Sequence, residues 1–387
     1  MPPAPIYLDH AATTPVRQEV LDAMMPYFAT KFGNASSTHR WGREARAAID
    51  TARERIAACL GARADEICLT SGGTEADNLC ILGGWRVQRG NGRNGVVTSP
   101  IEHKAVLASM HQAAREGADE RILAVDADGV VAMDSARALS RDDVAIASVM
   151  WVNNETGVIQ PIAELAALAK ERGAIFHTDA VQAFGKVDID TKAVPVDFLS
   201  ISGHKFGAPK AIGAVYVRRG TALAPLFFGG TQDRGRRPGT ENVPMAIALA
   251  TAMELTLAER DAEVARLRAL RDRLEQALLA KVPDAVVHGR GAPRAPHILN
   301  LSVPGTDSES MLMALDLQGI AASSGSACQS GSVTPTHVLD AMGVRADIGS
   351  AAIRLSLGKL TTDEHIDRVL EIFPSLIAKS RGMAGRF

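Results

Sequence analysis

Three polar residues stand where the chain leaves predicted buried strands. Lys205 follows one such strand and Asp179 ends another, while Thr74 opens a helix pattern in "LTSGGTEADN" (69–78). Partial burial would lower the pKa of a strand-end lysine and make it a usable amine nucleophile. A carboxylate at the tip of a buried strand needs a cation or hydrogen-bond donors. A helix start after a Ser-Gly-Gly turn is an anion site.

Each of these residues also has an ordinary structural explanation. Lys205 alone could be a surface lysine, and Asp179 and Thr74 could simply cap helices. Together they suit one cofactor, pyridoxal 5'-phosphate, which needs a lysine for its aldehyde, an acid for its ring nitrogen and a phosphate cup. The chain lacks G-x-x-x-x-G-K-[ST] and a convincing G-x-G-x-x-G at a strand–helix junction, so a nucleotide site is not supported.

A lone cysteine, Cys328, lies in the Ser/Gly-rich stretch "AASSGSACQSGSVTPTH" (321–337). The other three cysteines, Cys59, Cys68 and Cys80, lie in helix-like or strand-like apolar runs and are best explained as small buried residues. No Cys-x-x-Cys or zinc-finger spacing occurs, so no resident metal is expected. Cys328 alone has no packing explanation, and glycines on either side predict a loop that can move, from about Ser326 to Pro335.

The elements that must position these residues alternate between strands and helices. The strand patterns are continuously apolar, which is typical of strands buried on both faces of a mostly parallel sheet. Such alternation predicts a doubly wound α/β fold with its ligand site at the carboxyl ends of the strands. The predicted strands are 66–71, 95–100, 145–152, 174–179, 196–202 and 212–219, and the helices are Arg43–Leu60, Thr74–Gly83, Lys104–Glu116 and Ile162–Arg172.

A long charged helix pattern, about Met245 to Val282, leads into a second unit of α+β character. This unit includes a helix near Ser308–Leu317 and a final helix that begins at a predicted capping box, Thr361-x-x-Glu364. The predicted domains are residues 15–257 for the large cofactor-binding domain, and residues 1–14 with 258–387 for the small domain that carries the Cys328 loop.

The 387-residue composition is that of a soluble globular protein, with 46% hydrophobic and 22% charged residues. The net charge of −2 gives no reason to expect nucleic acid or an anionic membrane as a partner. No leader pattern and no apolar run long enough for a membrane span are evident, so a cytoplasmic location is predicted.

Motifs along nearly the whole chain resemble the cysteine desulfurases of the NifS/IscS group, within the class V aminotransferase superfamily. They are "YLDHAATTP", "TSGGTEADN", "IEHKAV", "MWVNNETGVIQPI", "FHTDAVQAFGKVDID", "SGHKFGAPKAIGAVYVRRG", "RGRRPGTENV", "ASSGSAC" and "IRLSLG". "MWVNNETG" and "GRRPGTEN" resemble the NifS branch most. The resemblance implies the fold-type I transferase architecture of pyridoxal-phosphate enzymes, with a mostly parallel seven-stranded sheet flanked by helices and a smaller α+β domain.

The resemblance also implies roles around the cofactor. Lys205 matches the lysine that holds the cofactor and moves protons at the substrate Cα, and Asp179 matches the partner of the ring nitrogen. Gln182 matches the partner of the ring hydroxyl, and His103 matches the histidine stacked on the ring, although the residues alone favour a helix-start histidine there. The matches to the phosphate cup are Thr74, Ser202 and His204.

Further matches concern the substrate and the second subunit. Thr240 matches a residue given to the cup of the other subunit, which implies a homodimer. Asn154 matches an amide on the cofactor and substrate side, Arg354 matches the clamp on the substrate carboxylate, and Cys328 matches the sulfur-accepting nucleophile. The pattern departs from the family at Ala35, Asp233 and Thr334, where proline, glutamate and an acidic residue are common.

The implied reaction removes sulfur from L-cysteine, giving L-alanine and a persulfide on Cys328. The sulfur then passes to an Fe–S scaffold protein, with nitrogenase maturation as one setting and with transient contact between Cys328 and an Fe–S cluster. Selenocysteine lyase and another class V aminotransferase-type enzyme remain alternatives, and Cys328 separates the desulfurase from an aminotransferase. A non-catalytic scaffold of the same fold is a further alternative, against which the intact Lys205, Asp179, His103 and Cys328 argue.

Overall fold

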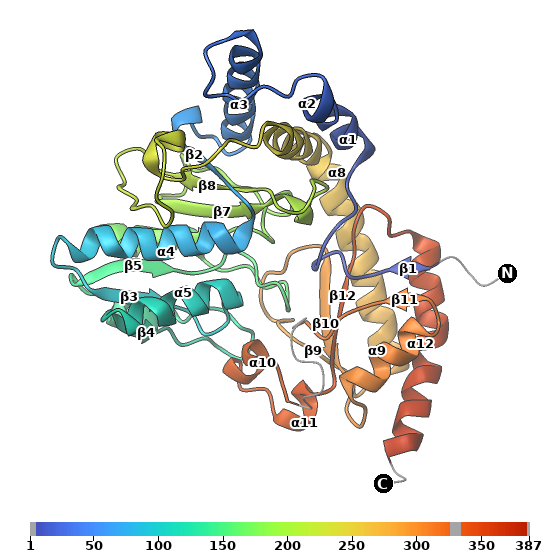
Figure 1. Ribbon diagram of the computed structural model, residues 1–387. Helices are drawn as coiled ribbons and strands as arrows, with labels where there is room; N and C mark the ends of the chain where they lie inside the picture. Colours follow the sequence, from blue (N-terminus) through green and yellow to red (C-terminus); the bar gives the residue numbers. More distant parts are fainter. Residues whose placement is uncertain (1–4, 326–333, 385–387) are drawn as a thin grey trace.

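A seven-stranded sheet forms the centre of the computed structural model, which describes residues 5–325 and 334–384 (Figure 1). The strand order is β2-β8-β7-β6-β5-β3-β4, and all neighbours are parallel except β8, which is antiparallel to both β2 and β7. This confirms the predicted mostly parallel sheet. The strands are β2 Ile67–Thr70, β3 Gly95–Thr98, β4 Asp119–Ile122, β5 Val144–Ser148, β6 Ile175–Asp179, β7 Phe198–Ser202 and β8 Gly213–Val217.

The six predicted strands are all present, and the sequence missed only the edge strand β4 of this sheet. Its sequence, "DERI", is charged, and no residue in it is buried. An edge strand is paired on one side only and tolerates charged residues, so it lacks the apolar run that identifies the central strands. The pattern that finds buried strands therefore cannot find this one.

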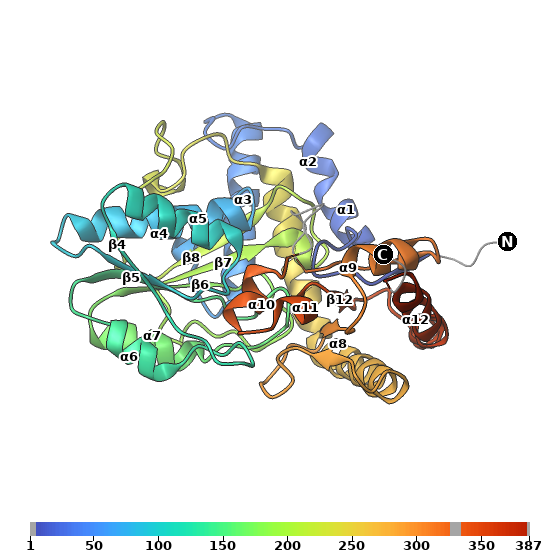
Figure 2. The same ribbon diagram turned by 90° about the horizontal axis from the view of Figure 1, so that it is seen from below.

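Helices cover both faces of the sheet, as Figure 2 shows. The helices α4 (Gly73–Arg89) and α5 (Lys104–Arg115) lie on one face, and α6 (Met133–Leu139) and α7 (Ile162–Glu171) on the other. The predicted end of α4 at Gly83 is wrong by six residues. Gly83 and Gly84 do not end the helix, because their missing side chains let it approach its neighbours: a Cβ on Gly84 would meet the Phe198 ring at 2.9 Å.

The 39-residue helix α8 (Val243–Lys281) joins two hydrophobic cores. Its N-terminal part, with Ala246 and Met253, belongs to the core of the large sheet. Its C-terminal part, with Leu267 and Leu274, belongs to a second core together with β10 and β12. The second core is built around β9 Val286–Val287, β10 Ile298–Ser302, α9 Ser308–Asp316, β12 Ala352–Ser356 and α12 Asp363–Ala384.

The N-terminal segment crosses to this second core. Strand β1 (Ile6–Tyr7) pairs in parallel with β11 (Ile320–Ala321), and Asp9 bridges to Ser356 at the end of β12. Residues from both ends of the chain therefore lie side by side next to the large sheet. The boundaries 15–257 and 1–14 with 258–387 stay a prediction.

The predicted capping box of α12 is wrong by one residue. Thr361 is buried, and its Oγ1 accepts a hydrogen bond from the Gly358 N–H instead. Thr362 and His365 make the reciprocal contacts, each side chain accepting from the other's backbone N–H at 3.4 Å. Either of the adjacent threonines, Thr361 and Thr362, could cap α12. Because Thr361 is packed in the loop before the helix, Thr362 takes this role.

The remaining helices are short, apart from α3 (Arg40–Ala58), which packs along α8. They are α1 Gln18–Met24, α2 Pro26–Ala29, α10 His337–Ala341, α11 Ala346–Gly349, and the 3-10 turns η1 Ala64–Glu66, η2 Gly203–Lys205 and η3 Gln232–Gly235. Across the described residues, none of the helices has both the length and the apolar character needed to cross a bilayer.

Candidate active site

A cavity of about 290 Å³ opens where β6 and β7 end and α4 begins. Nine of the eleven predicted site residues line it, although they come from segments up to 280 positions apart in the chain. They are Thr74, His103, Asn154, Asp179, Gln182, Ser202, His204, Lys205 and Arg354. Of the other two, Thr240 lies elsewhere and Cys328 lies outside the described residues.

Lys205 lies in η2, directly after β7, and reaches the N-terminal segment. Its Nζ donates to the carbonyl oxygens of Ala11 at 2.7 Å and Ala12 at 2.8 Å. Burial, with the nearby Arg354 charge, lowers the pKa of Lys205 to about 8. A substantial fraction of this lysine is therefore the free amine near neutral pH, which is the form that attacks carbonyl carbons.

Asp179 and His103 face each other across the cavity. The Asp179 carboxylate accepts from the Val181 N–H at 2.8 Å, and burial raises its pKa while His103 and Lys205 oppose that shift. His103 is the N-cap of α5, and its Nδ1 accepts from the Ala105 N–H at 3.1 Å. Although His103 is solvent-exposed, desolvation by the surrounding protein lowers its pKa. The neutral ring, with Nδ1 as the acceptor, carries its proton on Nε2.

A second buried acid, Asp77 on α4, also lines the cavity and was missed by the sequence reasoning. Ligand atoms of Asp77, His103 and Asp179 all lie within 4.8 Å of one another. Asp77 is 1% exposed, and burial beside Asp179 raises its pKa well above the usual range. Two carboxyl groups this close cannot both be charged in a buried site, so Asp77 is the neutral member of the pair.

Behind Asp77, a chain of buried hydrogen bonds runs into the sheet. His177 contacts Ser148 Oγ at 2.7 Å through Nδ1 and Ser200 Oγ at 2.9 Å through Nε2, and Asp77 Oδ1 lies 3.6 Å from the same Nε2. Burial lowers the pKa of His177 to about 3, so this imidazole is neutral. Asp77 therefore has no cationic partner here, which agrees with its neutral state.

The N-terminus of α4 has the properties of a phosphate cup. No side chain caps this helix, so its first N–H groups have no side-chain acceptor. Gly72 has φ +148, and a Cβ on Gly73 would come within 3.0 Å of Val181, so the two glycines keep the backbone open to the cavity. Thr74, Ser202 and His204 surround the same place. The residues present fit pyridoxal 5'-phosphate: an uncapped helix start for its phosphate, Asp179 for its ring and Lys205 for its aldehyde.

Arg354 on β12 is 3% exposed and is held from two sides. One terminal guanidinium nitrogen donates to Asp9 Oδ1 at 2.7 Å and the other to the Asn154 carbonyl at 2.7 Å, while Nε has no partner among the residues that the structure describes. Asp9 is a further residue that the sequence reasoning missed, although it lies in the quoted motif "YLDHAATTP". Gln182 is likewise fixed, since its Nε2 donates to the Ala11 carbonyl at 2.8 Å.

Both sides of the predicted Cys328 loop meet this cavity. Gly325, the last described residue before the gap, lines it, and so does His337 in α10. Glu155 lies between them, accepting from Thr336 Oγ1 at 2.5 Å, and a Cβ on Gly325 would come within 3.1 Å of its carboxylate. The predicted mobility concerns residues 326–335, of which 326–333 lie outside the described residues.

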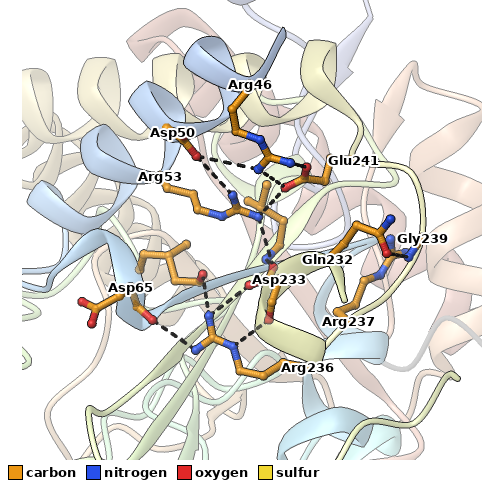
Figure 3. Close-up of polar contacts among 12 residues, drawn as sticks. Arg46, Asp50, Arg53, Asp65, Gln232, Asp233, Arg236, Arg237, Gly239 and Glu241 are labelled. Carbon is orange, nitrogen blue, oxygen red and sulfur yellow. Dashed lines mark hydrogen bonds and ion pairs between the residues drawn. The ribbon is translucent and has the colours of Figure 1, made fainter. Parts of the chain in front are cut away.

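Thr240 is exposed on the loop between β8 and α8, away from the cavity of its own chain. Figure 3 shows how this loop is fixed. Its neighbour Glu241 pairs with Arg46 at 2.5 Å and Arg53 at 2.9 Å, both on α3. Asp233 pairs with Arg53 and Arg236 and accepts from the Leu69 N–H at 3.1 Å, so the loop is tied to β2 as well.

Comparison with known proteins agrees with this geometry. The family model "Aminotransferase class-V" matches residues 6–369. A cysteine desulfurase of Gluconacetobacter diazotrophicus is 49% identical and covers 98% of this chain and 95% of its own length. A cysteine desulfurase IscS of Methanosarcina thermophila is 46% identical, over 98% of this chain and 93% of its own. A solved NifS-like protein superimposes with a TM-score of 0.90 at 34% identity, over 97% of this chain and 100% of its own.

These matches confirm the family, the fold and the class of enzyme that the motifs predicted. The names IscS and NifS-like both occur among the relatives, so they do not by themselves separate the two branches. The chain belongs to the class-V aminotransferase family and, within it, to the cysteine desulfurases.

Proposed function

We propose that this chain uses pyridoxal 5'-phosphate to convert L-cysteine to L-alanine and carries the released sulfur on Cys328. The observation that supports this most is the meeting of nine predicted site residues around one cavity. Lys205, Asp179 and the uncapped start of α4 are three independent matches to one cofactor. An aminotransferase or a selenocysteine lyase would share them, and a cysteine that follows Gly325, a residue lining the cavity, by three positions favours the desulfurase over the aminotransferase.

When bound, the cofactor withdraws electrons from the substrate Cα and so weakens its bond to hydrogen. Lys205 would hold the cofactor aldehyde, and its free amine would then move the Cα proton. Asp179 would keep a negative charge beside the ring nitrogen, with Asp77 neutral next to it. The Nε2 proton of His103 is available to the reacting atoms, because Nδ1 is engaged by the Ala105 N–H. Arg354 binds the substrate carboxylate through its fork.

The sulfur step uses Cys328 as a thiolate, the reactive form of cysteine. An S–S bond forms between Cys328 and the substrate sulfur, the substrate Cβ–S bond breaks, and the carbon fragment keeps the electron pair and is protonated to alanine. The balance is L-cysteine plus the Cys328 thiol giving L-alanine plus the Cys328 persulfide. The position of Gly325 supports this sulfur transfer: Gly325 lines the cavity, and it precedes Cys328 by three residues in the sequence.

We infer a homodimer in which Thr240 completes the phosphate cup of the partner. The rigid anchoring of its loop by Glu241 and Asp233 supports a role in presenting an exposed side chain. A set of exposed apolar side chains between residues 25 and 41, a segment that includes α2 and the start of α3, supports a subunit contact. It comprises Met25, Phe28, Phe32 and Trp41, each more than half exposed.

The wider setting follows from the same proposal. The sulfur acceptor would be an Fe–S scaffold protein in the cytoplasm, with nitrogenase maturation as one setting, and no resident metal is required. The unit that carries Cys328 would comprise residues 1–14 and 258–387.

Activity is tested by incubating the holoenzyme with L-cysteine and quantifying alanine and transferable sulfur. Wild type should produce the two in equal amounts, and Cys328→Ala should lose both. Transamination that survives in Cys328→Ala would overturn the proposal.

A further inference from the structure

Lys205 also lines a second cavity, of about 390 Å³, distinct from the active-site cavity. Its wall comes from the N-terminal segment, from α8 and from the loop after β12. Much of this wall is apolar, with Val16, Phe206, Leu357 and Leu360 among its residues. A cavity of this size, mostly apolar with a few polar groups, is typical of small-molecule sites.

Two buried histidines in this wall have unused hydrogen-bonding atoms. His10 is 4% exposed, and neither of its ring nitrogens has a hydrogen-bond partner among residues 5–325 and 334–384. His297 is 3% exposed, and its Nδ1 has no partner in the same part of the chain. Burial of polar atoms without partners is costly, so such atoms are rare in folded proteins unless a ligand or water satisfies them. Burial lowers the pKa of His10 to about 4 and lowers that of His297 well below its usual value, so both rings are neutral.

Lys186 adds an unpaired cation to the same wall. Among the described residues, no side chain forms an ion pair or hydrogen bond with its ammonium, and burial lowers its pKa. The other charged groups of the wall are engaged, Glu259 with Arg17 and Lys359, and Glu263 with Arg266. His10, His297 and Lys186 all line this one cavity, and the Lys186 charge lowers the pKa of both histidines.

The unused atoms define what a ligand must offer. Lys186 and the N–H of neutral His10 need an acceptor, which a carboxylate supplies. Gln182 donates its amide N–H to Ala11, so its Oε1 accepts from His297 Nε2 at 3.5 Å and leaves His297 Nδ1 as an unused acceptor. That nitrogen needs a donor on the ligand. A hydroxyl suits it better than an ammonium, because Lys186 would repel a second positive charge.

We propose that this cavity binds a small hydroxy acid with an apolar side chain. Its carboxylate contacts Lys186 and His10, its hydroxyl donates to His297 Nδ1, and its side chain lies against Val16 and Phe206. A phosphate group fits less well, because its charge of about −1.5 to −2 exceeds that of the Lys186 ammonium, and the Arg17 fork is held by Glu259.

Such a ligand would act on the active site through two direct neighbours. His10 immediately precedes Ala11 and Ala12, whose carbonyls hold Lys205. His297 contacts Gln182, which lines the active-site cavity. The second cavity is therefore a site for an effector of the enzyme.

The test uses calorimetric titration of the holoenzyme with three probes of matched shape: L-3-phenyllactate, 3-phenylpropionate without the hydroxyl, and L-3-phenyllactamide without the charge. Phenyllactate has no amine and so does not react with the cofactor. We expect it to bind best, phenylpropionate to bind several-fold more weakly, and the amide to give no detectable heat. Absence of phenyllactate binding, or equal binding of acid and amide, would overturn the proposal.

Three variants locate the site. Lys186→Met should weaken phenyllactate binding by at least about tenfold, because it removes the charged partner. Lys192→Met, at an exposed lysine outside both cavities, should leave binding unchanged. Arg354→Gln should also leave it unchanged, since Arg354 belongs to the active-site cavity. Binding that survives in Lys186→Met, or that is lost in Arg354→Gln, would contradict the assignment.

A measurement on the wild-type protein keeps the test independent of variant folding. Lys186 is acetylated with trace reagent and followed by peptide mass spectrometry, with and without phenyllactate. The ligand should slow acetylation of Lys186 but not of Lys192, and an unchanged rate at Lys186 would refute the site. None of these readouts uses desulfurase activity, so the result stands apart from the proposed function.

Discussion

The Lys205 ammonium lies 2.7 Å from the carbonyl oxygen of Ala11, and this contact connects the central sheet with the N-terminal segment at the active site. Lys205 comes from the central sheet, whereas Ala11 belongs to the N-terminal segment beside β12, the strand that carries Arg354. The segment "YLDHAATTP" therefore holds the lysine in place through backbone carbonyls, and its Asp9 holds Arg354. One short stretch therefore fixes two of the cationic groups that line the cavity.

Burial of Lys205 predicts an unusually reactive amine. Its pKa of about 8 lies below the usual value for lysine, so its free-amine fraction rises between about pH 7 and pH 9. Trace acetylation of the apoenzyme across pH should give a midpoint near 8 for Lys205. A Lys205 midpoint of about 10.4, the ordinary value for lysine, would show that burial does not lower its pKa.

The two buried acids should respond differently to the same substitution. Asp77→Asn replaces a neutral acid by a neutral amide of similar shape, so we expect kcat within about threefold of wild type. Asp179→Asn removes the charge beside the ring nitrogen, and we expect kcat to fall by roughly a hundredfold or more. Alanine formation measures both, and the cofactor absorbance shows whether each variant is loaded. Equal losses in the two variants would contradict a neutral Asp77.

Arg354 should control the affinity for substrate. Arg354→Lys keeps a positive charge but loses the fork, so we expect KM for L-cysteine to rise by roughly tenfold to a hundredfold with a smaller change in kcat. Asp9→Asn keeps an oxygen that can accept from Arg354, and its KM should change less than that of Arg354→Lys. A normal KM in Arg354→Lys would rule out the carboxylate clamp.

The loop of Thr240 should depend on the Glu241 ion pairs. The Glu241 side chain is 7% exposed, and Glu241→Gln removes the charge that lies 2.9 Å from Arg53, which leaves Arg53 only the longer ion pairs with Asp233 and Asp50. The cost should therefore lie below the roughly 3 kcal/mol of a fully broken buried pair. We expect faster hydrogen exchange at residues 231–242 and a lower melting temperature. The control is Glu254→Gln, which breaks the more exposed pair with Arg55 and should change neither. Identical exchange in both variants would exclude this anchoring.

The central fold could be predicted because its strands are buried on both faces. β6 and β7 are apolar apart from a few hydrogen-bonded polar residues. Asp179 at the end of β6 and Lys205 just after β7 line the same cavity. Strand β4 has no such signal because it is charged and at an edge. The sequence predicted too short a helix α4 because Gly83 and Gly84 allow close packing against other segments of the same chain. This packing depends on the three-dimensional fold and cannot be recognised from the sequence pattern.

The sequence motifs and the residues at strand ends predicted nine of the residues that line the active-site cavity. Asp77 was missed although it lies three residues after Thr74 in a quoted motif, because its role depends on the distance to Asp179, a residue 102 positions away. Asp9 was missed for the same reason, since its partner Arg354 is 345 positions away. The periodicity of apolar residues identifies helices and strands. It does not indicate which side chains, far apart in the sequence, lie close to each other in the fold.

The central claim is that sulfur passes from L-cysteine to Cys328, and mass analysis of the Cys328 peptide tests it most directly. The holoenzyme is incubated with L-cysteine without an acceptor, alkylated at once and digested, and alanine is measured in the same sample. The account predicts one extra sulfur atom on the Cys328 peptide, none on the peptides of Cys59, Cys68 and Cys80, and alanine in proportion. Alanine formed with no added sulfur on Cys328 would contradict it.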